Sequence, residues 1–337
     1  MKAQARDSLG AQSAWSAAKT VTITQSSPPV VVDSDGDSVP DSQDAFPNDP
    51  KKWADANGNG VGDNADEAAT EQAPAAPFLV SPGNNAAVSA MPVLKTGDFR
   101  TAAPGTSHAK TRWQIFRDED DACVLDILSP SALTSFTMPK LVLDGKTPYF
   151  WRAQFSDQKG ASSAWSDYEY FSTTTTGTDR NANGIPDAQE VSWKTDLDRD
   201  GIGDYRQKTI RSVKLYGTST QVGVSIKGCP TAHAIEAVES GSSYQSSLSS
   251  PGVSFKIAVA KPGDRITVTI YFSDAAFSGS RWYGYDTVSS KWAEFSAQAK
   301  FAADRRSVAL TLTDGGPGDV DGVANGVIVH TGTIFVQ

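Results

Sequence analysis

The sequence predicts an all-β protein made of tandem antiparallel β-sandwiches separated by loop linkers. Short runs of alternating apolar residues are broken by Gly, Pro, Asn and Ser clusters, which is the pattern of strands and tight turns. A two-strand motif occurs twice in the chain. Two short segments hold the whole acidic excess and few apolar residues. Together these features divide the chain into β domains and polar linkers.

The acidity of the chain is local. The 337 residues carry a formal net charge of −9, and the length suggests two or three domains. Nine aspartates and two lysines lie between Asp33 and Asp66, and seven acidic and three basic side chains lie between Asp179 and Asp204. The rest has no basic stripe, so nucleic acid is a poor partner. No apolar run reaches about 18 residues, so we expect no membrane span.

The sequence gives little information on export or on cysteine pairing. The start, MKAQARDSLG, lacks the apolar core of a signal peptide, so targeting pieces of an exported protein would lie outside this chain. Cys123 and Cys229 are the two cysteines, too few for a disulfide framework. Pairing and two free thiols are both open.

The N-terminal segment repeats a motif found later in the chain. Lys2 to Thr24 reads KAQARDSLGAQSAWSAAKTVTIT, and Arg152 to Thr174 reads RAQFSDQKGASSAWSDYEYFSTT, at a constant offset of 150 residues. Such self-similarity is typical of a modular array. Since an isolated hairpin is marginal in water, we expect residues 1–27 to be the last strands of a truncated domain. The alternative is that they complete another chain's sheet.

Residues 77–175 are expected to form a β-sandwich. Large side chains alternate along two of its predicted strands: Trp113, Ile115, Tyr149, Trp151, Ala153 and Phe155. The run LVLDGKTPYFWRAQ, with Leu143, Thr147, Tyr149 and Trp151 at the spaced positions, resembles the fibronectin type III pattern. The resemblance implies a tyrosine corner, in which the Tyr149 hydroxyl bonds the backbone upstream.

Residues 208–337 predict a second antiparallel sandwich. VSFKIAVA, RITVTIYF and SVALTLT alternate in polarity, as half-buried strands do. In the second of these runs, one face carries Ile266, Val268, Ile270 and Phe272. Pro262-Gly263-Asp264, Trp292 and LTLTDGGPGDVDGVANGVI, in that order, resemble the choice-of-anchor U domain of bacterial surface proteins. The mode of anchoring is not indicated.

The acidic segments contain four copies of one twelve-residue pattern. Oxygen-bearing side chains lie at positions 1, 3, 5, 9 and 12, and an apolar residue lies at position 7. This is the ligand spacing of a calcium loop, in which position 7 offers its backbone carbonyl. Clustered carboxylates repel one another, and a bound cation turns that repulsion into coordination. The sequence therefore predicts Ca²⁺ as the cofactor.

The expected ligands are Asp33, Asp35, Asp37, Val39, Asp41 and Asp44 in loop 1; Asp55, Asn57, Asn59, Val61, Asp63 and Asp66 in loop 2; Asp179, Asn181, Asn183, Ile185, Asp187 and Glu190 in loop 3; and Asp196, Asp198, Asp200, Ile202 and Asp204 in loop 4. Glycine occupies the turn at position 6 in loops 2 to 4, whereas loop 1 has Ser38 there. Position 12 of loop 4 is Gln207 instead of a carboxylate, which makes this site the weakest.

The segment from Asp33 to Asp66 resembles bacterial thrombospondin type 3 repeats, including the spacer DAFPNDP. Residues 28–76 and 176–207 are therefore expected to be two calcium-binding linkers between the sandwiches. A filled linker should be compact and stiff, and an empty one flexible and self-repelling. The alternative, an acidic disordered linker, gives no reason for the repeated register.

Catalytic and zinc motifs are weak in this chain. Gly36-Asp37-Ser38 matches an esterase motif, but no histidine lies near it in the sequence to activate the serine. The three histidines share no spacing with a nucleophile, and no Cys/His cluster suits zinc. We therefore expect the protein not to be an enzyme.

Two further groups of residues have more than one interpretation. Asp319, Asp321 and Asn325 could chelate a fifth calcium ion, although Asp and Asn in Gly-rich runs more often form turns. An aromatic surface patch for a ligand is one interpretation of Trp282, Tyr283 and Tyr285. Core or inter-strand packing is expected to explain four other tryptophans: Trp15, Trp113, Trp151 and Trp165.

The expected function is that of a calcium-binding modular protein, secreted or on a bacterial cell surface, with a structural or adhesive role. Its expected partners are unidentified surface or matrix proteins or glycans, with self-association as a further option. Two alternatives to this function remain open. In the first, the chain is a non-catalytic accessory region of a secreted hydrolase. In the second, it is a subunit of an extracellular filament assembled by β-strand donation through residues 1–24.

Overall fold

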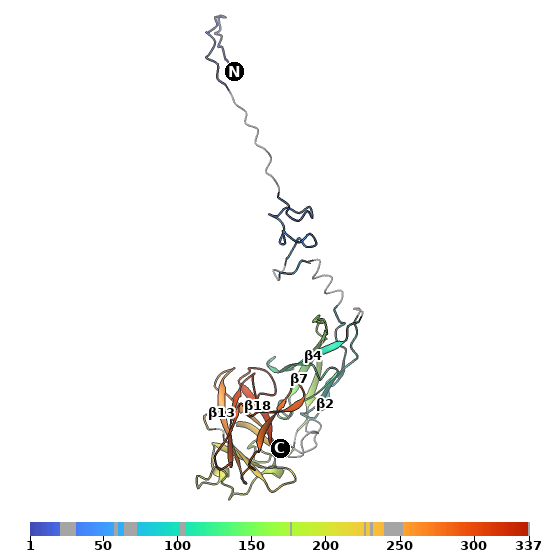
Figure 1. Cartoon of the computed structure of the whole chain (residues 1–337), viewed down its shortest axis with the longest axis vertical. Coiled ribbons are helices and arrows are strands. Elements are labelled where there is room, and N and C mark those ends of the chain that lie inside the picture. Colours follow the sequence, from blue (N-terminus) through green and yellow to red (C-terminus); the bar gives the residue numbers. More distant parts are fainter. Residues whose placement is uncertain are drawn as a thin grey trace. The chain divides into compact units, whose positions relative to one another are not determined.

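The computed structural model forms two compact units, Met1–Ala68 and Ala69–Gln337 (Figure 1). It describes residues 1–20, 32–56, 60–63, 73–101, 105–175, 177–225, 227–229, 232–238 and 252–335. The named elements are strands and two short 3-10 turns. Among the described residues, no helix has both the length and the apolar character needed to cross a membrane. The second unit is all-β and holds two sandwiches.

The first sandwich occupies the N-terminal half of the second unit. Its strands are β1 (Leu79–Ser81), β2 (Ala86–Val88), β3 (Val93–Thr96), β4 (His108–Arg117), β5 (Cys123–Ser129), β6 (Ser135–Thr137), β7 (Pro148–Asp157) and β8 (Glu169–Thr173). One sheet has the order β1-β3-β6 and the other β2-β8-β7-β4-β5. All pairs are antiparallel except β2–β8. β2 follows β1, which lies in the other sheet, and pairs with β8 at the edge of the five-stranded sheet.

The alternation of large side chains on β4 and β7 builds the core of this sandwich. Trp113 lies opposite Ala153, and Ile115 lies opposite Trp151. The six side chains expected to alternate here are all 1% exposed or less. The rings of Trp113 and Trp151 stack with their centroids 6.0 Å apart. Their indole N–H groups donate to the carbonyls of Ala132 and Pro82, so neither buried nitrogen is left without a partner.

The tyrosine corner expected from the sequence is present. The backbone N–H of Asp144 donates to the hydroxyl oxygen of Tyr149 at 2.8 Å. Tyr149 is 1% exposed, and burial raises its pKa to about 12. The hydroxyl therefore stays protonated at neutral pH and fixes the turn that leads into β7.

Replacing Tyr149 with Phe should lower the free energy of unfolding of the second unit by about 1–2 kcal/mol, because the Asp144 N–H loses its acceptor in a partly buried turn. Denaturant unfolding of both proteins measures this loss. Tyr168→Phe is the matched control, because Tyr168 is 43% exposed. A loss no larger than that of the control would contradict the role of the hydroxyl.

Within its described residues, the second sandwich has ten strands in two sheets. They are β9 (Ile210–Lys214), β10 (Gln221–Ser225), β11 (Ala232–Val238), β12 (Gly252–Ala258), β13 (Arg265–Phe272), β14 (Arg281–Asp286), β15 (Lys291–Glu294), β16 (Ala299–Phe301), β17 (Ser307–Thr313) and β18 (Val327–Phe335). The sheet orders are β16-β17-β13-β10-β9 and β11-β12-β18-β14-β15. Val268, Ile270 and Phe272 of β13 are buried between them, as the alternation predicted.

A buried histidine organises the interior near β14 and β18. The indole N–H of Trp282 donates to Nε2 of His330 at 3.1 Å, and Nδ1 of His330 lies 2.7 Å from the Gly318 carbonyl oxygen. Burial lowers the pKa of His330 to about 4, so the ring is neutral and satisfied. Trp282 is 1% exposed and Tyr285 8% exposed. The interpretation of these aromatic residues as a surface patch is therefore wrong.

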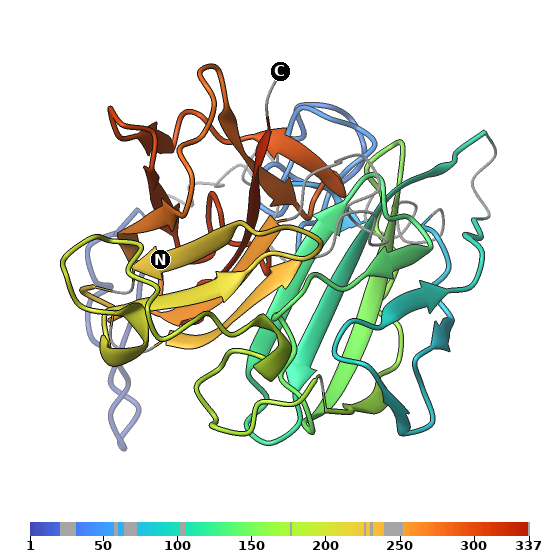
Figure 2. The same cartoon turned by 90° about the horizontal axis from the view of Figure 1, so that it is seen from below.

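The two sandwiches contact each other directly; the green strands of the first and the orange and red strands of the second are drawn in Figure 2. Lys256 of β12 forms a 2.7 Å ion pair with Asp144, and Lys140 forms a 2.6 Å ion pair with Glu236. The Asp126 N–H donates to a carbonyl oxygen of the β17–β18 turn at 3.1 Å. One apolar cluster also spans both sandwiches. Direct contacts between the two sandwiches, and not only loops 3 and 4, therefore hold them together.

The N-terminal hairpin reproduces the turn region after β7. Backbone N–H groups of Ser13 and Ser16 donate to the carbonyls of Ala5 and Ala3, each at 2.9 Å. Their counterparts 150 residues later make the same bonds, also at 2.9 Å. The side-chain bonds of the two aspartate turns and of the paired serines match as well. The sequence repeat is therefore a structural repeat.

The two copies differ at the tryptophan of the repeat. Trp165 is half-buried, and the Arg152 guanidinium lies 4.1 Å from its ring centroid. Trp15 is 62% exposed, and Lys2 occupies the position of the arginine. The packing expected for Trp15 is therefore not found within the described hairpin.

The two cysteines, Cys123 and Cys229, are both free thiols in the structure.

Candidate metal centres

The four twelve-residue loops share one backbone frame. Loop 1 is Asp33–Asp44, loop 2 begins at Asp55, loop 3 is Asp179–Glu190 and loop 4 is Asp196–Gln207. At position 6 the φ angles of Ser38, Gly60, Gly184 and Gly201 are 79°, 80°, 80° and 87°. This left-handed conformation favours glycine. Ser38 adopts it too, so loop 1 keeps the frame despite its departure from the sequence pattern.

The same hydrogen bonds hold each loop in shape. The N–H of position 6 donates to the position-1 carboxylate at 2.8–3.1 Å. The N–H of position 2 donates to the position-9 carboxylate at 2.7–3.0 Å. The N–H of position 9 donates to the carbonyl just before position 1 at 2.8–2.9 Å. In loops 1 and 4, where oxygens of three aspartates lie within 4.8 Å of one another, this frame brings side chains toward a common centre.

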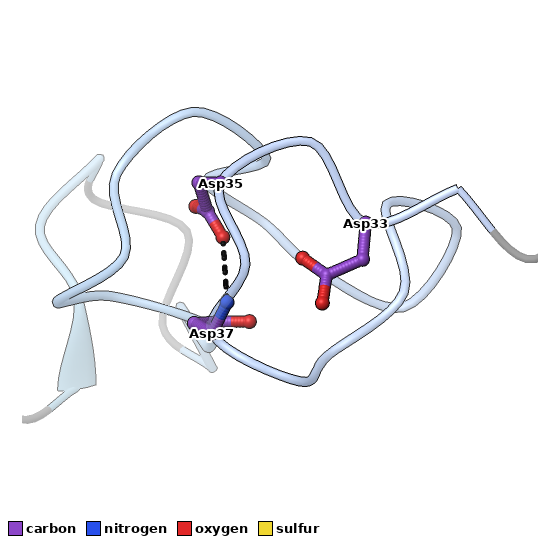
Figure 3. Close-up of side chains that lie close together, drawn as sticks. All are labelled: Asp33, Asp35 and Asp37. Atoms are coloured by element: carbon purple, nitrogen blue, oxygen red, sulfur yellow. Dashed lines mark hydrogen bonds between the residues drawn. The ribbon is translucent and has the colours of Figure 1, made fainter.

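Loop 1 has carboxylate oxygens that no protein group satisfies. Figure 3 shows Asp33, Asp35 and Asp37 turned toward the inside of the loop, and one oxygen of each lies within 4.8 Å of the others. One shielded oxygen each of Asp35, Asp37 and Asp44 has no hydrogen-bond partner. Burial, together with the charges of Asp37, Asp44 and Asp33, raises the pKa of Asp35.

These unpartnered oxygens indicate whether the residues of loop 1 suit a bound cation. A buried carboxylate oxygen without a partner is costly, and here three of them come from positions 3, 5 and 12 of one loop. Hard oxygen donors of this kind are the ligands that Ca²⁺ prefers. The residues present in loop 1 therefore fit the ion that the spacing predicts.

Loop 2 is described only in part. Asp55, Val61 and Asp63 lie in the shared frame, with Gly60 donating to Asp55 and Ala56 donating to Asp63. Asn57, Asn59 and Asp66, which are also expected ligands, lie outside the described residues. The described half of loop 2 matches loop 1, and its ligand set stays a prediction.

Loop 3 is attached to the second sandwich. Ile185 at position 7 is 5% exposed and joins the apolar core. The N–H of Ile235 donates to the Gly184 carbonyl at 3.0 Å, and that of Ala237 donates to Gln189 at 2.6 Å. Position 9 begins a 3-10 turn, η1 (Asp187–Gln189). The sandwich therefore fixes one side of the loop.

The ligand side chains of loop 3 gather at its open side. The amide nitrogens of Asn181 and Asn183 donate to one oxygen of Glu190, at 2.6 and 3.2 Å. Rotating either amide by half a turn replaces its nitrogen with its oxygen. Positions 3, 5 and 12 of loop 3 then present three oxygens to the same point, as a calcium loop requires.

Loop 4 is attached to the same sandwich through its position-9 aspartate. Asp204, at the start of η2 (Asp204–Arg206), is 3% exposed and accepts hydrogen bonds from the Leu197 N–H and the Ser212 hydroxyl. Oxygens of Asp196, Asp198 and Asp204 lie within 4.8 Å of one another. Burial raises the pKa of both Asp198 and Asp204.

Gln207 occupies the centre of loop 4. Its amide nitrogen donates to Asp198 and Asp200, each at 3.2 Å, and to the Ile202 carbonyl at 3.0 Å. These acceptors are positions 3, 5 and 7 of the ligand pattern. The amide satisfies these oxygens when no ion is bound. Rotated by half a turn it would offer its own oxygen, but a neutral ligand at position 12 adds no charge, which is a structural reason for loop 4 to be the weakest site.

The acidic turn between β17 and β18 has a different arrangement. Asp314 accepts the N–H groups of Gly263 and Gly326, and Asp319 accepts those of Gly315 and Val329. Asp321 accepts a bond from Val323 two residues later. These carboxylates hold the turn through its backbone. The turn-forming role accounts for these contacts, but one shielded oxygen of Asp314 has no partner. A fifth calcium site at Asp319, Asp321 and Asn325 stays a prediction.

The sequence pattern did not single out two exposed aromatic side chains, Trp193 between loops 3 and 4 and Tyr205 within loop 4. Trp193 is 65% exposed, and Tyr205 is 54% exposed. Both line a cavity of about 540 Å³ between the two loops. Nothing in the one-dimensional pattern marks them, because the cavity exists only after both loops have folded onto the sandwich.

Comparisons with known proteins give no family and only distant similarities to solved structures. No protein-family model matches it, and none of the curated proteins does. Fibronectin type III-like modules of Clostridium thermocellum CbhA match with 11% identity and a TM-score of 0.23, over 31% of this chain and 47% of theirs. A Dictyoglumus thermophilum alpha-L-rhamnosidase matches with 12% identity and a TM-score of 0.26, over 78% of this chain and 25% of its own.

Carbohydrate-binding modules of the β-sandwich superfamily match with 12% identity and a TM-score of 0.22, over 79% of this chain and 93% of theirs. The chain spans less than half the length of the first two structures. TM-scores this low give no basis for transferring a binding activity or a reaction.

Proposed function

We propose that this chain is a calcium-binding modular protein of the cell exterior with a structural or adhesive role and no catalytic activity. The observation that carries the proposal is the set of three shielded, unpartnered carboxylate oxygens in loop 1. They lie in a backbone frame that the chain builds four times. The turn between β17 and β18 differs in degree, because backbone N–H groups bind both oxygens of Asp319 and only one shielded oxygen, that of Asp314, is left without a partner.

The proposed ligands in each loop are the residues at positions 1, 3, 5, 7, 9 and 12, with position 7 acting through its carbonyl. When bound, Ca²⁺ neutralises the clustered carboxylates of a loop. The residues at positions 1 and 9 also hold the loop backbone through the N–H groups of positions 6 and 2. They therefore have two jobs, and their substitution should disturb the loop even without an ion.

Several features favour an extracellular setting. Loops of this type in extracellular modules bind with dissociation constants of roughly 10⁻⁴ to 10⁻³ M, which suits millimolar calcium outside cells. The thrombospondin type 3-like spacer and the choice-of-anchor U-like run point the same way. Ions in loops 3 and 4 would fix a surface of the second sandwich, and ions in loops 1 and 2 would stiffen the segment that precedes the first.

Calcium titration of the chain by calorimetry should give three or four ions with affinities near millimolar. Asp44→Asn should remove about one ion, because Asp44 is the position-12 ligand of loop 1 and is 9% exposed. Asp49→Asn is the matched control, since Asp49 lies in the spacer and pairs with Lys52 at 3.3 Å. Its ion count should equal that of the parent.

An absence of calcium uptake near millimolar concentration would overturn the proposal. Equal ion counts for Asp44→Asn and the parent would show that loop 1 is not one of the sites. Small-angle scattering of the same samples measures stiffening directly, because a filled linker should give a longer, narrower particle than the chelated chain.

Strand donation remains a second candidate function, and the N-terminal hairpin favours it. The hairpin copies the turn region after β7, yet Trp15 is 62% exposed, whereas its counterpart Trp165 stacks on an arginine. In the first sandwich β7 pairs with β4. Among the described residues no strand pairs with the hairpin in this way, which suits the hairpin to add to another sheet. Light scattering over a concentration series tests this candidate, and a strictly monomeric chain excludes it.

A further inference from the structure

The cavity between loops 3 and 4 has a floor on β9 and walls from both loops. Its lining includes Glu190 of loop 3, Gln207 of loop 4 and Arg211 of β9. Its volume of about 540 Å³ is within the range of small-ligand sites. All of its lining residues belong to the second unit, so folding of that unit alone assembles it.

Two aromatic rings give this cavity stacking surfaces. Trp193 and Tyr205 are 65% and 54% exposed, unlike the tryptophans of the first sandwich core, and both line the cavity. The Arg206 guanidinium lies 5.3 Å from the Tyr205 ring centroid, and its Nε donates to the Tyr205 hydroxyl. An exposed ring of this kind stacks well on the apolar face of a sugar, and its polar tip can hydrogen-bond.

The charged groups of the cavity favour an anion. Its two lining carboxylates are turned into the loops. Glu190 accepts from Asn181 and Asn183, and Asp204 accepts from Leu197 and Ser212. The lining cations are Arg206, Lys208 and Arg211, and none of them is in an ion pair within the described part of the chain.

Arg211 carries the most specific signal. Its Nη1 donates to the carbonyls of Gln207 and Ile210, at 3.3 and 3.1 Å, which fixes the guanidinium plane. Its Nε is shielded from solvent and has no partner. An atom closed to water is also closed to a ligand, so a carboxylate in the cavity would meet the terminal nitrogens of Arg211, of which Nη2 makes no hydrogen bond within the described part of the chain.

We propose that this cavity binds a carboxylate-bearing sugar, that is, a uronic acid residue of an acidic polysaccharide. The sugar ring stacks on Trp193, and its carboxylate pairs with Arg211 and Arg206. The inference rests on the proposed function, because ions in loops 3 and 4 neutralise the carboxylates that would otherwise repel an anionic ligand. It names the glycan class that an adhesive role would use.

The test is calorimetry of the full chain with trigalacturonate in saturating calcium, after the heat of trigalacturonate with calcium alone has been subtracted. The parent should bind trigalacturonate at least tenfold more tightly than its fully methyl-esterified form, which has the same rings without the charge. Triglutamate is the second probe and should not bind. Equal binding of the methyl ester, or equal binding of triglutamate, overturns the proposal.

Variants locate the site. Trp193→Ala and Arg211→Gln should each weaken trigalacturonate binding at least tenfold. Trp53→Ala is the matched control, because Trp53 is also exposed, at 48%, and does not line the cavity. Unchanged binding by Trp193→Ala, the variant at an exposed position, contradicts the proposal even if Arg211→Gln fails to fold.

The calcium count of each protein is measured first, so that the two ideas fail separately. Normal calcium uptake without trigalacturonate binding defeats this inference alone. Absence of calcium uptake defeats the proposed function. Trigalacturonate binding that is equally strong after chelation would remove the link between the loops and the sugar, and would likewise overturn the inference as stated.

Discussion

Replacing Gln207 with Glu should tighten calcium binding at loop 4 about tenfold or more. In the parent, the Gln207 amide nitrogen donates to Asp198, Asp200 and the Ile202 carbonyl, so it competes with a cation for those oxygens. Glutamate removes that donor and restores the position-12 carboxylate of a calcium loop. Calcium affinity in such loops follows the number of charged ligands and the rigidity of the site.

The same substitution should make the second unit more dependent on calcium. Without an ion, loop 4 of the variant carries a fifth carboxylate next to Asp198 and Asp200, and like charges in close contact repel. The thermal midpoint should therefore fall below that of the parent in chelator and rise above it in saturating calcium. This crossing of the two midpoints is the signature to look for in calorimetry scans.

Gln158→Glu is the matched control for this prediction. Gln158 is exposed in the turn after β7, so the charge change is the same but far along the chain from loop 4. Its calcium isotherm should overlay that of the parent. A Gln207→Glu variant with unchanged affinity would show that loop 4 does not bind calcium through the expected register.

The second unit should lose stability as the pH rises from 6.5 to 9, by about 1.4 kcal/mol or more, which corresponds to one pKa unit. Burial, together with the charge of Asp321, raises the pKa of Asp319 to about 9. Burial, together with the charge of Asp314, raises the pKa of Asp321 to about 7. Both groups start from 3.8 in the unfolded chain.

The sign follows from proton binding. Above pH 3.8 the folded unit binds more protons at this pair than the unfolded chain does, so its stability falls as the pH rises through about 7 and 9. His330 acts in the opposite sense. Its pKa is lowered from 6.5 to about 4, so its contribution is present above pH 6.5 and is lost as the pH falls toward 4. Between pH 6.5 and 9 the aspartate pair acts without this opposition.

Denaturant unfolding at fixed, saturating calcium measures this dependence. Asp319→Asn should flatten the decline above pH 6.5, even though it weakens the bonds from the N–H groups of Gly315 and Val329. Asp118→Asn, at an exposed position, should keep the slope of the parent. If the stability of the parent does not change between pH 6.5 and 9, the raised pKa values of Asp319 and Asp321 are contradicted.

Most of the fold could be predicted from the sequence, because strands and calcium-type loops follow from the spacing of apolar and oxygen-bearing residues along the chain. Alternate burial of Trp113, Ile115, Trp151 and Ala153 follows from the two-residue period of a strand. The offset of the N-terminal repeat predicted a hairpin, and the hydrogen bonds match. The sequence does not reveal that Trp15 is exposed, because the exposure depends on which strand lies next to it.

For the candidate metal centres, too, some features could be predicted from the sequence and others only from the structure. The spacing of oxygen-bearing residues alone determined the register of the four loops, since a tight loop brings alternate residues to one centre. The sequence marked Gln207 as a departure, and the structure showed that its amide fills the centre of loop 4. The parallel β2–β8 pair likewise depends on a crossover between sheets, which no local pattern encodes.

The all-β class, the repeated hairpin and the oxygen positions of the loops follow from the amino-acid sequence, because each is a property of neighbouring residues. Which aspartates hold turns, and which keep unpartnered oxygens, depends on the folded chain, and so does the meeting of Trp193, Tyr205 and Arg211 at one cavity. These outcomes depend on which distant groups a side chain meets. A hydrogen-bond partner or a cavity wall is supplied by the fold, not by the adjoining residues.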